Sequence, residues 1–501
     1  MSKSLLTSLA LSLVFAASAH AAPLRWAATN DILTLDPHSQ DHNSSNAIGA
    51  HIYEGLTRLS KDYRPEPSLA TKWTYLSPTQ VRFELRKGVK FHDGTPFTAD
   101  DVIFSFGRIN QPQGTKQTYV SGIKEIRRID AHTVDLILEA PTPMLLQNII
   151  SFQIMSQAWA KKNNTLQTQD YKAKEENYAS RNANGTGPYK LISWQPDQAV
   201  KLVANPDWWD KPGGNVTELS YLPIKSAPTR VAALLSGDVD LVTDLPPADF
   251  LRLKDDGKVK VVEGPETRTI FFVMDQGSDE IKDSSVKGRN PFKDKRVREA
   301  LNLALDREAI RRAIMRGLSV PAALMVPPGV NGYDAALDQP LKPDLEKARK
   351  LLADAGYAQG LELPLHCPNN RYVNDEQICQ AAASMWAKVG VKIRLISTPF
   401  QVHSQTFQRG ESSFYMLGWG VSTYDSLYAL QALAHTRTQG ADGNFNFGRL
   451  SDARLDELIQ RIKFEPDVAK RNGLIREALV RLRDEAFFIP LHHQIRPWAM
   501  K

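Results

Sequence analysis

The stretch VRFELRKGVKFHDGTPFTADDV, residues 81–102, constrains the fold of this chain more than any other. Its first residues alternate between apolar and charged side chains, which is the period of a strand with one buried face. Asp93 and Gly94 then supply turn chemistry, because Asp can bond its own backbone and Gly accepts positive φ. Thr98 and Asp101 form a capping-box pattern ahead of an apolar run. The stretch therefore predicts a strand, a turn and a capped helix.

Helical and extended patterns alternate along the rest of the chain. Four further helices are expected to begin at polar capping residues: Asp294, Asp344, Asn374 and Ser451. The third is followed by VKIRLIS, residues 391–397, which alternates like a strand. This order predicts an α/β fold, and the absence of a repeat argues against a solenoid. A length of 501 residues predicts two or three lobes rather than one core.

The first 21 residues have the pattern of a cleaved export signal. Lys3 precedes an apolar run at residues 5–17, and Ala19, His20 and Ala21 fit the small-x-small cleavage pattern. We expect a periplasmic protein that begins at Ala22, and no cysteine follows the signal to carry a lipid anchor. No later segment offers about 18 uninterrupted apolar residues, so the chain is not expected to be embedded in a membrane.

Charge patterning argues against a nucleic-acid partner. The formal net charge is +6, and cleavage of the signal would lower it to +5 because only Lys3 is lost. Acidic and basic residues are interspersed, and the sequence contains neither a basic stripe nor a nucleic-acid reader motif.

Catalytic motifs are absent from the sequence. It contains no G-x-S-x-G elbow, H-E-x-x-H, G-x-x-x-x-G-K-[ST] or strand-following G-x-G-x-x-G. His492 and His493 are adjacent, so in a strand their rings face opposite sides and do not readily share a metal. We expect no enzyme activity and no cofactor, and a secreted hydrolase is the remote alternative.

The two cysteines, Cys367 and Cys379, lie twelve positions apart. In an exported chain such a pair favours one disulfide, here closing a loop that contains Arg371. A pair of buried free thiols is the alternative. Their spacing matches no recognised metal-ligand pattern and no His pair frames it, which argues against a metal site.

Further motifs follow in order along the chain: LDPH at 35–38, YEGL at 53–56, GTGPYKLISW at 185–194, GDVDLVTDLP at 237–246, FKDKRVREALNLALDRE at 292–308 and LGWG at 417–420. With residues 81–102 they resemble the family 5 solute-binding proteins, which deliver peptides, nickel complexes and related solutes to ABC importers. The resemblance runs from about residue 24 to the C-terminus.

This resemblance implies a periplasmic binding protein-like α/β fold, in which two main lobes close on a cleft and a third lobe is inserted. We expect lobe I at 22–59, 184–270 and 486–501, lobe II at 60–183, and lobe III at 271–485. Family members usually continue beyond a segment such as HHQIRPWAMK, so either the C-terminus is clipped or lobe I lacks its last packing segment.

The function implied is that of a monomeric binding protein that captures a peptide or small amino-acid-derived ligand. The expected partners are that ligand and the transmembrane subunits of an ABC permease. The same fold could instead carry an opine-like conjugate, a modified sugar or a metal chelate.

Arg371 is the first candidate for ligand binding, because its position resembles the arginine that holds the ligand's carboxylate in dipeptide-binding members. A guanidinium can grip a carboxylate with two charge-assisted bonds. A surface salt bridge is the alternative role. Trp419 occupies the family's tryptophan position and is expected either to stack on the ligand or to pack in the core. Tyr424 is a weaker candidate of the same kind.

Ser422 departs from the family pattern. Peptide-binding relatives have an aspartate at this position, which pairs with the peptide's ammonium, and a hydroxyl cannot neutralise that charge. Either Asp425 reaches in from a re-shaped loop, or the ligand lacks a peptide-like amine. The resemblance also implies that the loop at Asn30, Asp31 and Ile32 faces the ligand, as does Tyr119. Asp31 could then be a second ammonium partner.

Overall fold

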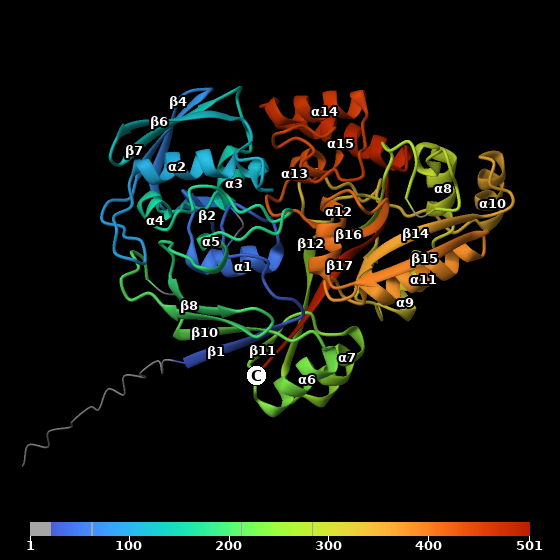
Figure 1. Cartoon of the computed structure of the whole chain (residues 1–501), viewed down its shortest axis with the longest axis horizontal. Helices are drawn as coiled ribbons and strands as arrows, with labels where there is room; N and C mark the ends of the chain where they lie inside the picture. The colour runs from blue at the N-terminus through green and yellow to red at the C-terminus, as the bar shows by residue number, and fades with distance from the viewer. Residues whose placement is uncertain (1–21, 62–63, 212, 283) are drawn as a thin grey trace, which may run out of the picture.

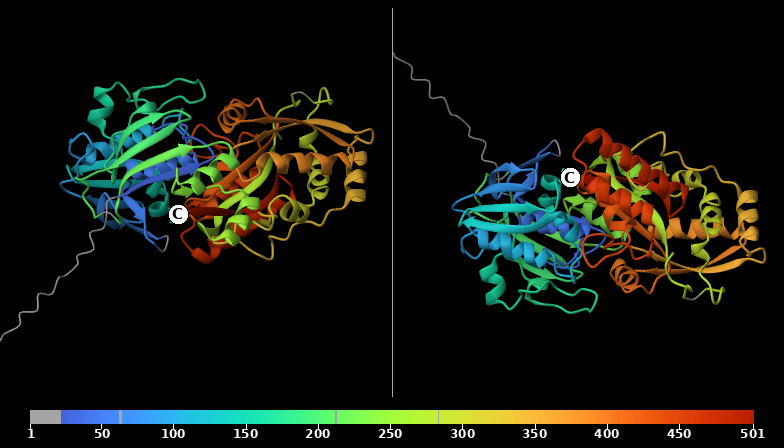
Figure 2. Two further views of the ribbon diagram at one scale, coloured as in Figure 1. Left: turned by 90° about the horizontal axis from the view of Figure 1, so that it is seen from below. Right: turned by 90° about the horizontal axis from the view of Figure 1, so that it is seen from above.

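The computed structural model describes residues 22–61, 64–211, 213–282 and 284–501. The export signal expected at residues 1–21 lies outside the described residues. The chain forms two bodies that lie side by side, one from the N-terminal part and one from the C-terminal part (Figure 1, Figure 2). No helix in the described part of the chain combines the length and apolarity of a membrane span.

One half of the 11-stranded main sheet comes mostly from the N-terminal body. Its strands are, in spatial order, β8 (Tyr189–Gln195), β9 (Ala199–Ala204), β10 (Val216–Pro223), β1 (Ala22–Ala28) and β11 (Leu241–Val242). β1 runs parallel to both of its neighbours. The accompanying helices are α1 (Asn43–Ile52), α6 (Ala227–Ser236) and α7 (Pro247–Asp256).

Two long antiparallel strands, β12 (Lys260–Met274) and β17 (Phe488–Met500), join the halves of this sheet. At one end β17 pairs with β11, and on its other edge β12 pairs with β16 (Phe414–Gly420). β13 (Ser319–Pro321) adds a short pairing to β17. The two strands are therefore the continuous connection between the bodies.

The C-terminal body continues the sheet from β16 to β14 (Leu361–Pro368) and β15 (Val391–Thr398), which run parallel. Its core contains Phe272, Trp386 and Phe414, whose rings pack within 5.1–5.7 Å of one another. The helical segments of this body are η3 (Pro291–Lys293), α8 (Lys295–Leu303), α9 (Arg307–Ala313), α10 (Leu345–Asp354), α11 (Asp375–Ala387), α12 (Phe400–Gln408), α13 (Ser426–Ala429), the π-helix η4 (Leu430–Ala434), α14 (Ala453–Phe464) and α15 (Val468–Asp484).

A separate four-stranded antiparallel sheet is built from residues 70–138. Its spatial order is β4 (Ala70–Ser77), β5 (Gln80–Leu85), β7 (Thr133–Leu138) and β6 (Ile123–Asp130). Around it lie β2 (Thr57–Leu59) and β3 (Pro65–Pro67), which pair with each other, and the helical segments α2 (Ala99–Ile109), η1 (Gln117–Val120), α3 (Leu145–Asn148), η2 (Ile149–Ser151), α4 (Gln157–Lys162) and α5 (Tyr178–Arg181).

The predicted strand, turn and capped helix are confirmed as β5, a turn and α2. Val81 and Phe83 are fully buried, and Thr98 and Asp101 form both bonds of a capping box. The α/β fold class is confirmed as well.

The predicted helix starts are confirmed with two differences. Asp294 and Asp344 cap α8 and α10 through their side chains. Asn374 precedes α11 in the left-handed region, at φ 54°, and its side chain does not cap the helix. The expectation for Ser451 was wrong by one residue, because Asp452 accepts the Leu455 N–H and caps α14.

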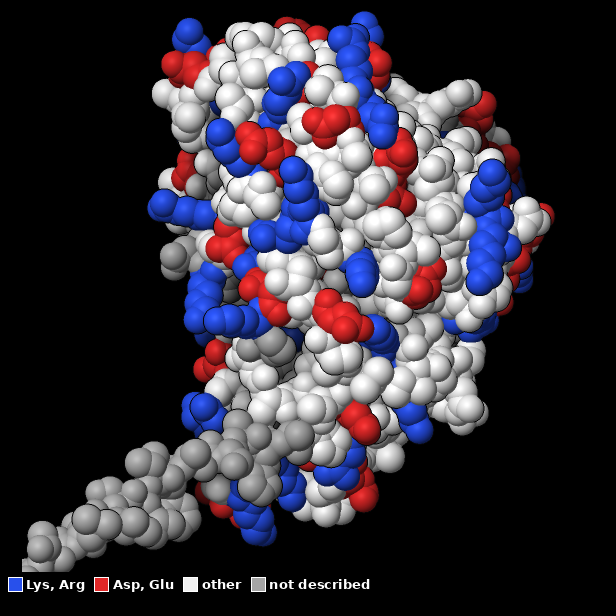
Figure 3. All heavy atoms as spheres, turned by 90° about the vertical axis from the view of Figure 1, so that its left-hand side faces the viewer, with Lys and Arg blue, Asp and Glu red and all other residues white. Residues whose placement is uncertain are grey.

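The three lobe boundaries stay a prediction. The boundary at residue 270 falls inside β12, and that at residue 486 falls just before β17. The first lies on one of the two strands that connect the bodies, and the second lies two residues before the other. On the face drawn in Figure 3, basic and acidic side chains are interspersed, as their distribution in the sequence led us to expect.

Cys367 and Cys379 are joined in a disulfide, as predicted. The bond links the end of β14 to α11 and closes the loop that carries Arg371. Asp375 at the start of α11 further fixes this loop by accepting the Arg371 N–H at 2.9 Å and the Tyr372 N–H at 3.0 Å.

Replacing both cysteines with alanine is expected to lower the free energy of unfolding by about 3 kcal/mol, because the crosslink restricts the unfolded chain. Urea denaturation of the Cys367→Ala/Cys379→Ala variant beside the oxidised wild type measures this difference. Non-reducing peptide mapping should recover the crosslinked pair. Two thiols that react with an alkylating agent in exported, unreduced protein would contradict the prediction.

Candidate ligand-binding site

A buried cavity, here called the central cavity, lies where the two bodies meet. Its lining comes from distant parts of the chain. The N-terminal body contributes Leu33, residues 40–43 and 46 at the start of α1, and Tyr119 of η1. The remaining lining residues are Arg268 of β12, Arg371, Tyr372, several residues of α12, residues 417–420 and 422, Tyr428 and Phe445. Its volume is about 80 Å³. Ligand pockets commonly hold about 300–1,000 Å³, so a solute of dipeptide size requires the surrounding groups to move apart.

A larger cavity, of about 340 Å³, lies inside the C-terminal body between α8, α15 and residues 322–325. The central cavity is nevertheless the better candidate. Five of its lining residues carry buried side-chain atoms without a hydrogen-bond partner among the described residues: the Nε of Arg371, both ring nitrogens of His42, the indole N–H of Trp419, the Oδ1 of Asn46 and the Oε1 of Gln408. Buried polar groups are normally paired, so these atoms are available to a ligand.

Arg371 supplies a buried cation to the lining of the central cavity. Its guanidinium lies over the rings of Tyr372 and Phe400, at 5.1 and 5.2 Å from their centroids. Burial lowers the pKa of Arg371 to about 10, and the neighbouring Arg268 charge adds to the effect. At neutral pH the side chain therefore remains protonated in a poorly solvated position.

Glu266 is already shared between other cations. It accepts from Arg268 Nε at 3.1 Å and from Arg496 Nη2 at 3.0 Å. Burial disfavours its charge, but Arg496, Arg268 and Arg371 together outweigh burial and lower the pKa of Glu266 to about 2. The group therefore holds three guanidiniums against two carboxylates, because Asp244 also pairs with Arg496, at 3.6 Å from its Nη1. Such an excess of buried positive charge fits a ligand anion such as a carboxylate or phosphate.

The glycines of the LGWG motif allow Tyr372 and Arg268 to pack closely against β16. A Cβ at Gly418 would come within 2.7 Å of the Tyr372 ring, and one at Gly420 within 2.9 Å of the Arg268 guanidinium. With glycine at both positions, the Tyr372 hydroxyl accepts the Gly418 N–H at 2.8 Å, and Arg268 Nη1 donates to the Gly418 carbonyl at 3.0 Å.

His42 and Trp419 line the same cavity with unpaired nitrogens. The His42 ring stacks on Phe400 at 5.2 Å. Burial, together with the charges of Arg371 and Arg268, lowers the pKa of His42 well below its usual value, so the ring is neutral at pH 7. A neutral imidazole offers one donor and one acceptor, and the indole offers one donor.

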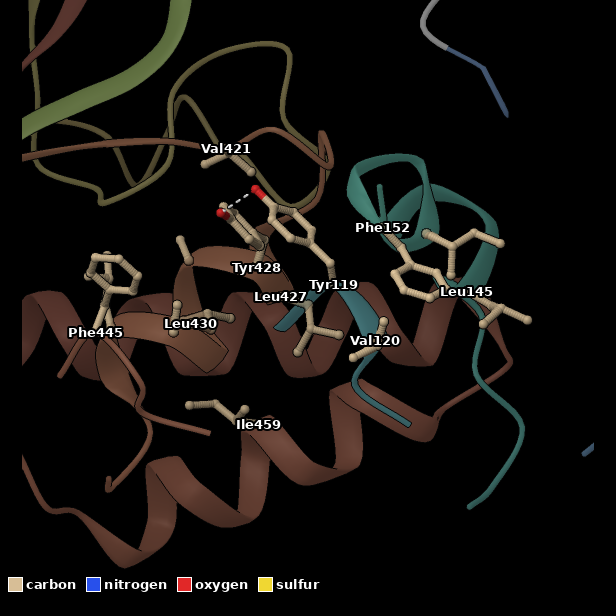
Figure 4. Close-up of a cluster of buried hydrophobic side chains, with 14 of the residues drawn as sticks. Tyr119, Val120, Leu145, Phe152, Val421, Leu427, Tyr428, Leu430, Phe445 and Ile459 are labelled. Carbon is tan, nitrogen blue, oxygen red and sulfur yellow. Dashed lines mark hydrogen bonds between the residues drawn. The ribbon is translucent and has the colours of Figure 1, made fainter. Parts of the chain in front are cut away.

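Tyr119 and Ser422 also line the central cavity, next to each other. The Tyr119 hydroxyl is 3.1 Å from Ser422 Oγ and 2.8 Å from the Tyr428 hydroxyl. Figure 4 shows Tyr119 and Tyr428 pointing toward one another from separate segments, next to a buried apolar cluster. Asp41 accepts hydrogen bonds from both of these tyrosines.

Asp425 and Tyr424 are not brought to the cavity lining. Both carboxylate oxygens of Asp425 accept from Arg471 at 2.7 Å, and one of them also caps α13 by accepting the Leu427 N–H. The side chain is thus committed to a buried ion pair. Tyr424 adopts a positive φ of 56°, and its carbonyl accepts the Asn331 N–H at 2.9 Å.

The loop at Asn30, Asp31 and Ile32 is held in place by the hairpin of β8 and β9. Asp31 accepts from the Trp194 indole N–H at 3.1 Å and from the Asp197 N–H at 2.8 Å. Ile32 is fully buried in the core beside β1. Asn30 and Asp31 border a separate cavity of about 20 Å³ that shares Leu33 and Phe400 with the central cavity, so this loop lies next to the site.

Sequence reasoning missed Asp41, His42 and Arg268 as candidates. The polar run HSQDHNSSN, residues 38–46, extends from the end of the LDPH motif into the start of α1 and was a usable signal for the first two. Arg268 had no local signal, because it occupies one position of a long strand.

Comparison with known proteins supports the family resemblance of the sequence motifs. The model of the bacterial extracellular solute-binding proteins, family 5 Middle, matches residues 64–441. Heme-binding protein A of Haemophilus influenzae is 28% identical over 479 residues, covering 90% of this chain and 83% of that protein. The dipeptide-binding protein of Escherichia coli is 28% identical over 457 residues, covering 85% and 80%.

Among solved structures, the periplasmic binding protein DppA from Helicobacter pylori, in complex with the peptide STSA, superposes with a TM-score of 0.84. It is 23% identical, and the match covers 96% of this chain and 94% of that one, which establishes the shared fold. With a family model matched over most of its length, the chain belongs to the bacterial extracellular solute-binding proteins of family 5.

Proposed function

We propose that this protein is the periplasmic solute-binding component of an ABC import system. It captures a peptide or small amino-acid-derived ligand in the central cavity and delivers it to the transmembrane subunits of a permease. The observation that carries the proposal is the buried Arg371, whose Nε lacks a partner among the described residues and which lies beside Arg268 and Arg496. A ligand anion would neutralise this charge excess and complete its hydrogen bonds.

The proposed lobes are those expected from the sequence: 22–59, 184–270 and 486–501 for lobe I, 60–183 for lobe II and 271–485 for lobe III. β12 and β17 are the natural hinge, because they are the strands that pass from one body to the other. Closure about this hinge buries the ligand, and the permease recognises the closed form.

A compact ligand other than a peptide is the second candidate. The volume of about 80 Å³ and the hydroxyl of Ser422 at the family's acidic position both favour it over a long peptide. An opine-like conjugate, a modified sugar or a metal chelate with an anionic group would neutralise the charge excess around Arg371 equally well.

Native mass spectrometry of protein purified from the periplasm tests the proposal. We expect one small anionic solute, which denaturation releases chemically unchanged. Added back at a hundredfold excess over its dissociation constant, it should stabilise the protein by about 2.7 kcal/mol in a thermal-shift assay.

Three results would contradict the proposal. They are protein that carries no solute, protein that no peptide or amino-acid-derived anion stabilises, and steady conversion of an added peptide to products. The last result would favour the hydrolase alternative.

A further inference from the structure

Asp41 is an acidic side chain that borders the central cavity beside Tyr119 and Tyr428. It lies in the loop just before α1 and is half-buried. Its carboxylate accepts from the Tyr119 hydroxyl at 3.1 Å, from Asn46 Nδ2 at 2.7 Å and from the Tyr428 hydroxyl. All three donors are neutral, so they fix the carboxylate in place without cancelling its charge.

The two tyrosines that bond this carboxylate belong to an aromatic cluster that borders the cavity. Tyr119 and Tyr428 stack at 5.5 Å with an interplanar angle of 19°, and Trp419 packs against Tyr428 at 5.2 Å. Phe445 contacts the Trp419 ring at 4.7 Å. Faces of aromatic rings attract cations, and a carboxylate among them adds a full opposite charge. The group therefore has the composition of a site for an ammonium or guanidinium ion.

Lys116 is a protein cation that the Asp41 charge stabilises. Its ammonium, however, donates to Gln153 Oε1 at 3.4 Å. Burial lowers the pKa of Lys116 to about 8 in spite of the attraction from Asp41 and Asp36. Lys116 thus offsets part of the negative charge from a distance and leaves the cavity side of Asp41 open to a ligand.

We propose that Asp41 binds the cationic group of the ligand and that the ligand is a small zwitterion whose anionic group binds Arg371. Asp41 thereby supplies, from the loop before α1, the negative charge that Ser422 does not supply from the segment after β16. Ser422 belongs to the same cluster, with its Oγ 3.1 Å from the Tyr119 hydroxyl. The assignment rests on the function proposed above and narrows its ligand class.

Charge balance supports a zwitterion over a simple anion. The cavity holds an excess of positive charge at Arg371 and a carboxylate with neutral donors at Asp41. A simple anion would leave the Asp41 carboxylate only partly compensated, by Lys116, and a poorly compensated charge is costly once closure removes it from water. A zwitterion of matching length neutralises both groups at once.

The competing explanation is that Asp41 only holds the two bodies together and does not contact the ligand. It joins Tyr119 of η1 to Tyr428 of α13, and these residues belong to different bodies. A purely structural role would affect the binding of every ligand to the same degree. A ligand contact would affect only those that carry the cation.

Paired probes separate the two roles. Each alanyl dipeptide is compared with its propanoyl analogue, and each free amino acid with its des-amino acid, so that the members of a pair differ only by the amine. Calorimetric dissociation constants are measured for the wild type, Asp41→Asn and Asp31→Asn. The last variant tests the other aspartate suggested as an ammonium partner, whose carboxylate is bonded to Trp194 and the Asp197 N–H and does not line the central cavity.

In the wild type, the amine is expected to tighten binding about tenfold or more, as for a buried charge pair. In Asp41→Asn this preference should fall to about twofold or less, while the propanoyl and des-amino probes keep their wild-type affinity. Asp31→Asn should keep the full preference for the amine. Should Asp41→Asn fail to fold by circular dichroism, Asp41→Ser removes the same charge with a smaller side chain.

The proposal is overturned if Asp41→Asn weakens both members of each pair equally, if the preference disappears in Asp31→Asn instead, or if the wild type binds amine-free anions as tightly as zwitterions. In each of these cases the proposed solute-binding function stands. Binding of no probe of either kind by the wild type would also overturn this assignment, whereas the solute-binding function is overturned if the purified protein carries no solute.

Discussion

Replacing Arg371 with alanine is expected to weaken binding of the co-purifying solute by about 2–5 kcal/mol, or about thirtyfold or more in the dissociation constant. The ligand's anion would enter a cavity whose forked donor is gone, although Arg268 remains nearby. Because burial and the Arg268 charge both disfavour the Arg371 cation, its removal should not lower the melting temperature of the ligand-free protein. Titration calorimetry and thermal unfolding measure the two effects.

Two variants serve as controls for this result. Arg371→Lys keeps the charge but not the planar fork, so an intermediate loss of affinity is expected. Arg409→Ala removes an arginine whose partner is the exposed Glu411 and should leave the dissociation constant unchanged. An unchanged dissociation constant in Arg371→Ala would remove Arg371 from the site.

Replacing Asp36 with asparagine is expected to lower the free energy of unfolding by about 3–5 kcal/mol, because it leaves the Arg108 cation buried without its partner. Both side chains of this pair are completely buried, and Arg108 holds the two carboxylate oxygens at 2.5 and 2.6 Å. Burial opposes the Asp36 charge, but the Arg108 charge and hydrogen bonds outweigh it and lower the pKa of Asp36 to about 2. Urea denaturation of the variant beside the wild type measures the loss.

The pKa of Asp36 also predicts a pH dependence. Its folded-state pKa of about 2 lies below the ordinary value of 3.8, so the unfolded state binds this proton first as the pH falls. The stabilisation is therefore complete above pH 3.8 and is lost as the pH falls through about 2. The Asp36→Asn variant should lack this component of the acid-induced loss.

The exposed pair Arg127 and Glu125 provides a matched control for Asp36. Its side chains are 55% and 47% exposed, so Glu125→Gln should leave the free energy of unfolding nearly unchanged. The double variant Asp36→Asn/Arg108→Met removes the stranded cation and should recover part of the lost stability. Equal unfolding free energies for Asp36→Asn and the wild type would show that the pair contributes nothing net.

Local pattern was sufficient for most secondary structure. The strand and capped helix at residues 81–102 appeared as expected, because alternation and capping depend on residues only a few positions apart. The start of α14 was wrong by one residue because two polar residues, Ser451 and Asp452, compete for the cap, and the second accepts the helix N–H. Family motifs then supplied the overall architecture, which periodicity alone could not provide.

The site was only partly predictable. The resemblance directed attention to Arg371, Trp419, Ser422 and Tyr119, and all four line the central cavity. It also suggested Asp425. Arg471 binds both oxygens of that residue from 46 positions later in the chain, and no local sequence pattern predicts this pairing. The fate of a carboxylate depends on the cations that the fold brings to it, and these are commonly distant in sequence.

The sequence by itself determined the class of this protein and the order of its elements, since these follow from short-range patterns and family motifs. Only the tertiary structure decided which charges share the central cavity. Asp41, Arg268, Arg371 and Tyr428 come from four separate segments and meet where the two bodies join. The electrostatics of a binding site depend on distances through space, and those distances are set by how β12 and β17 hold the bodies together rather than by separation along the chain.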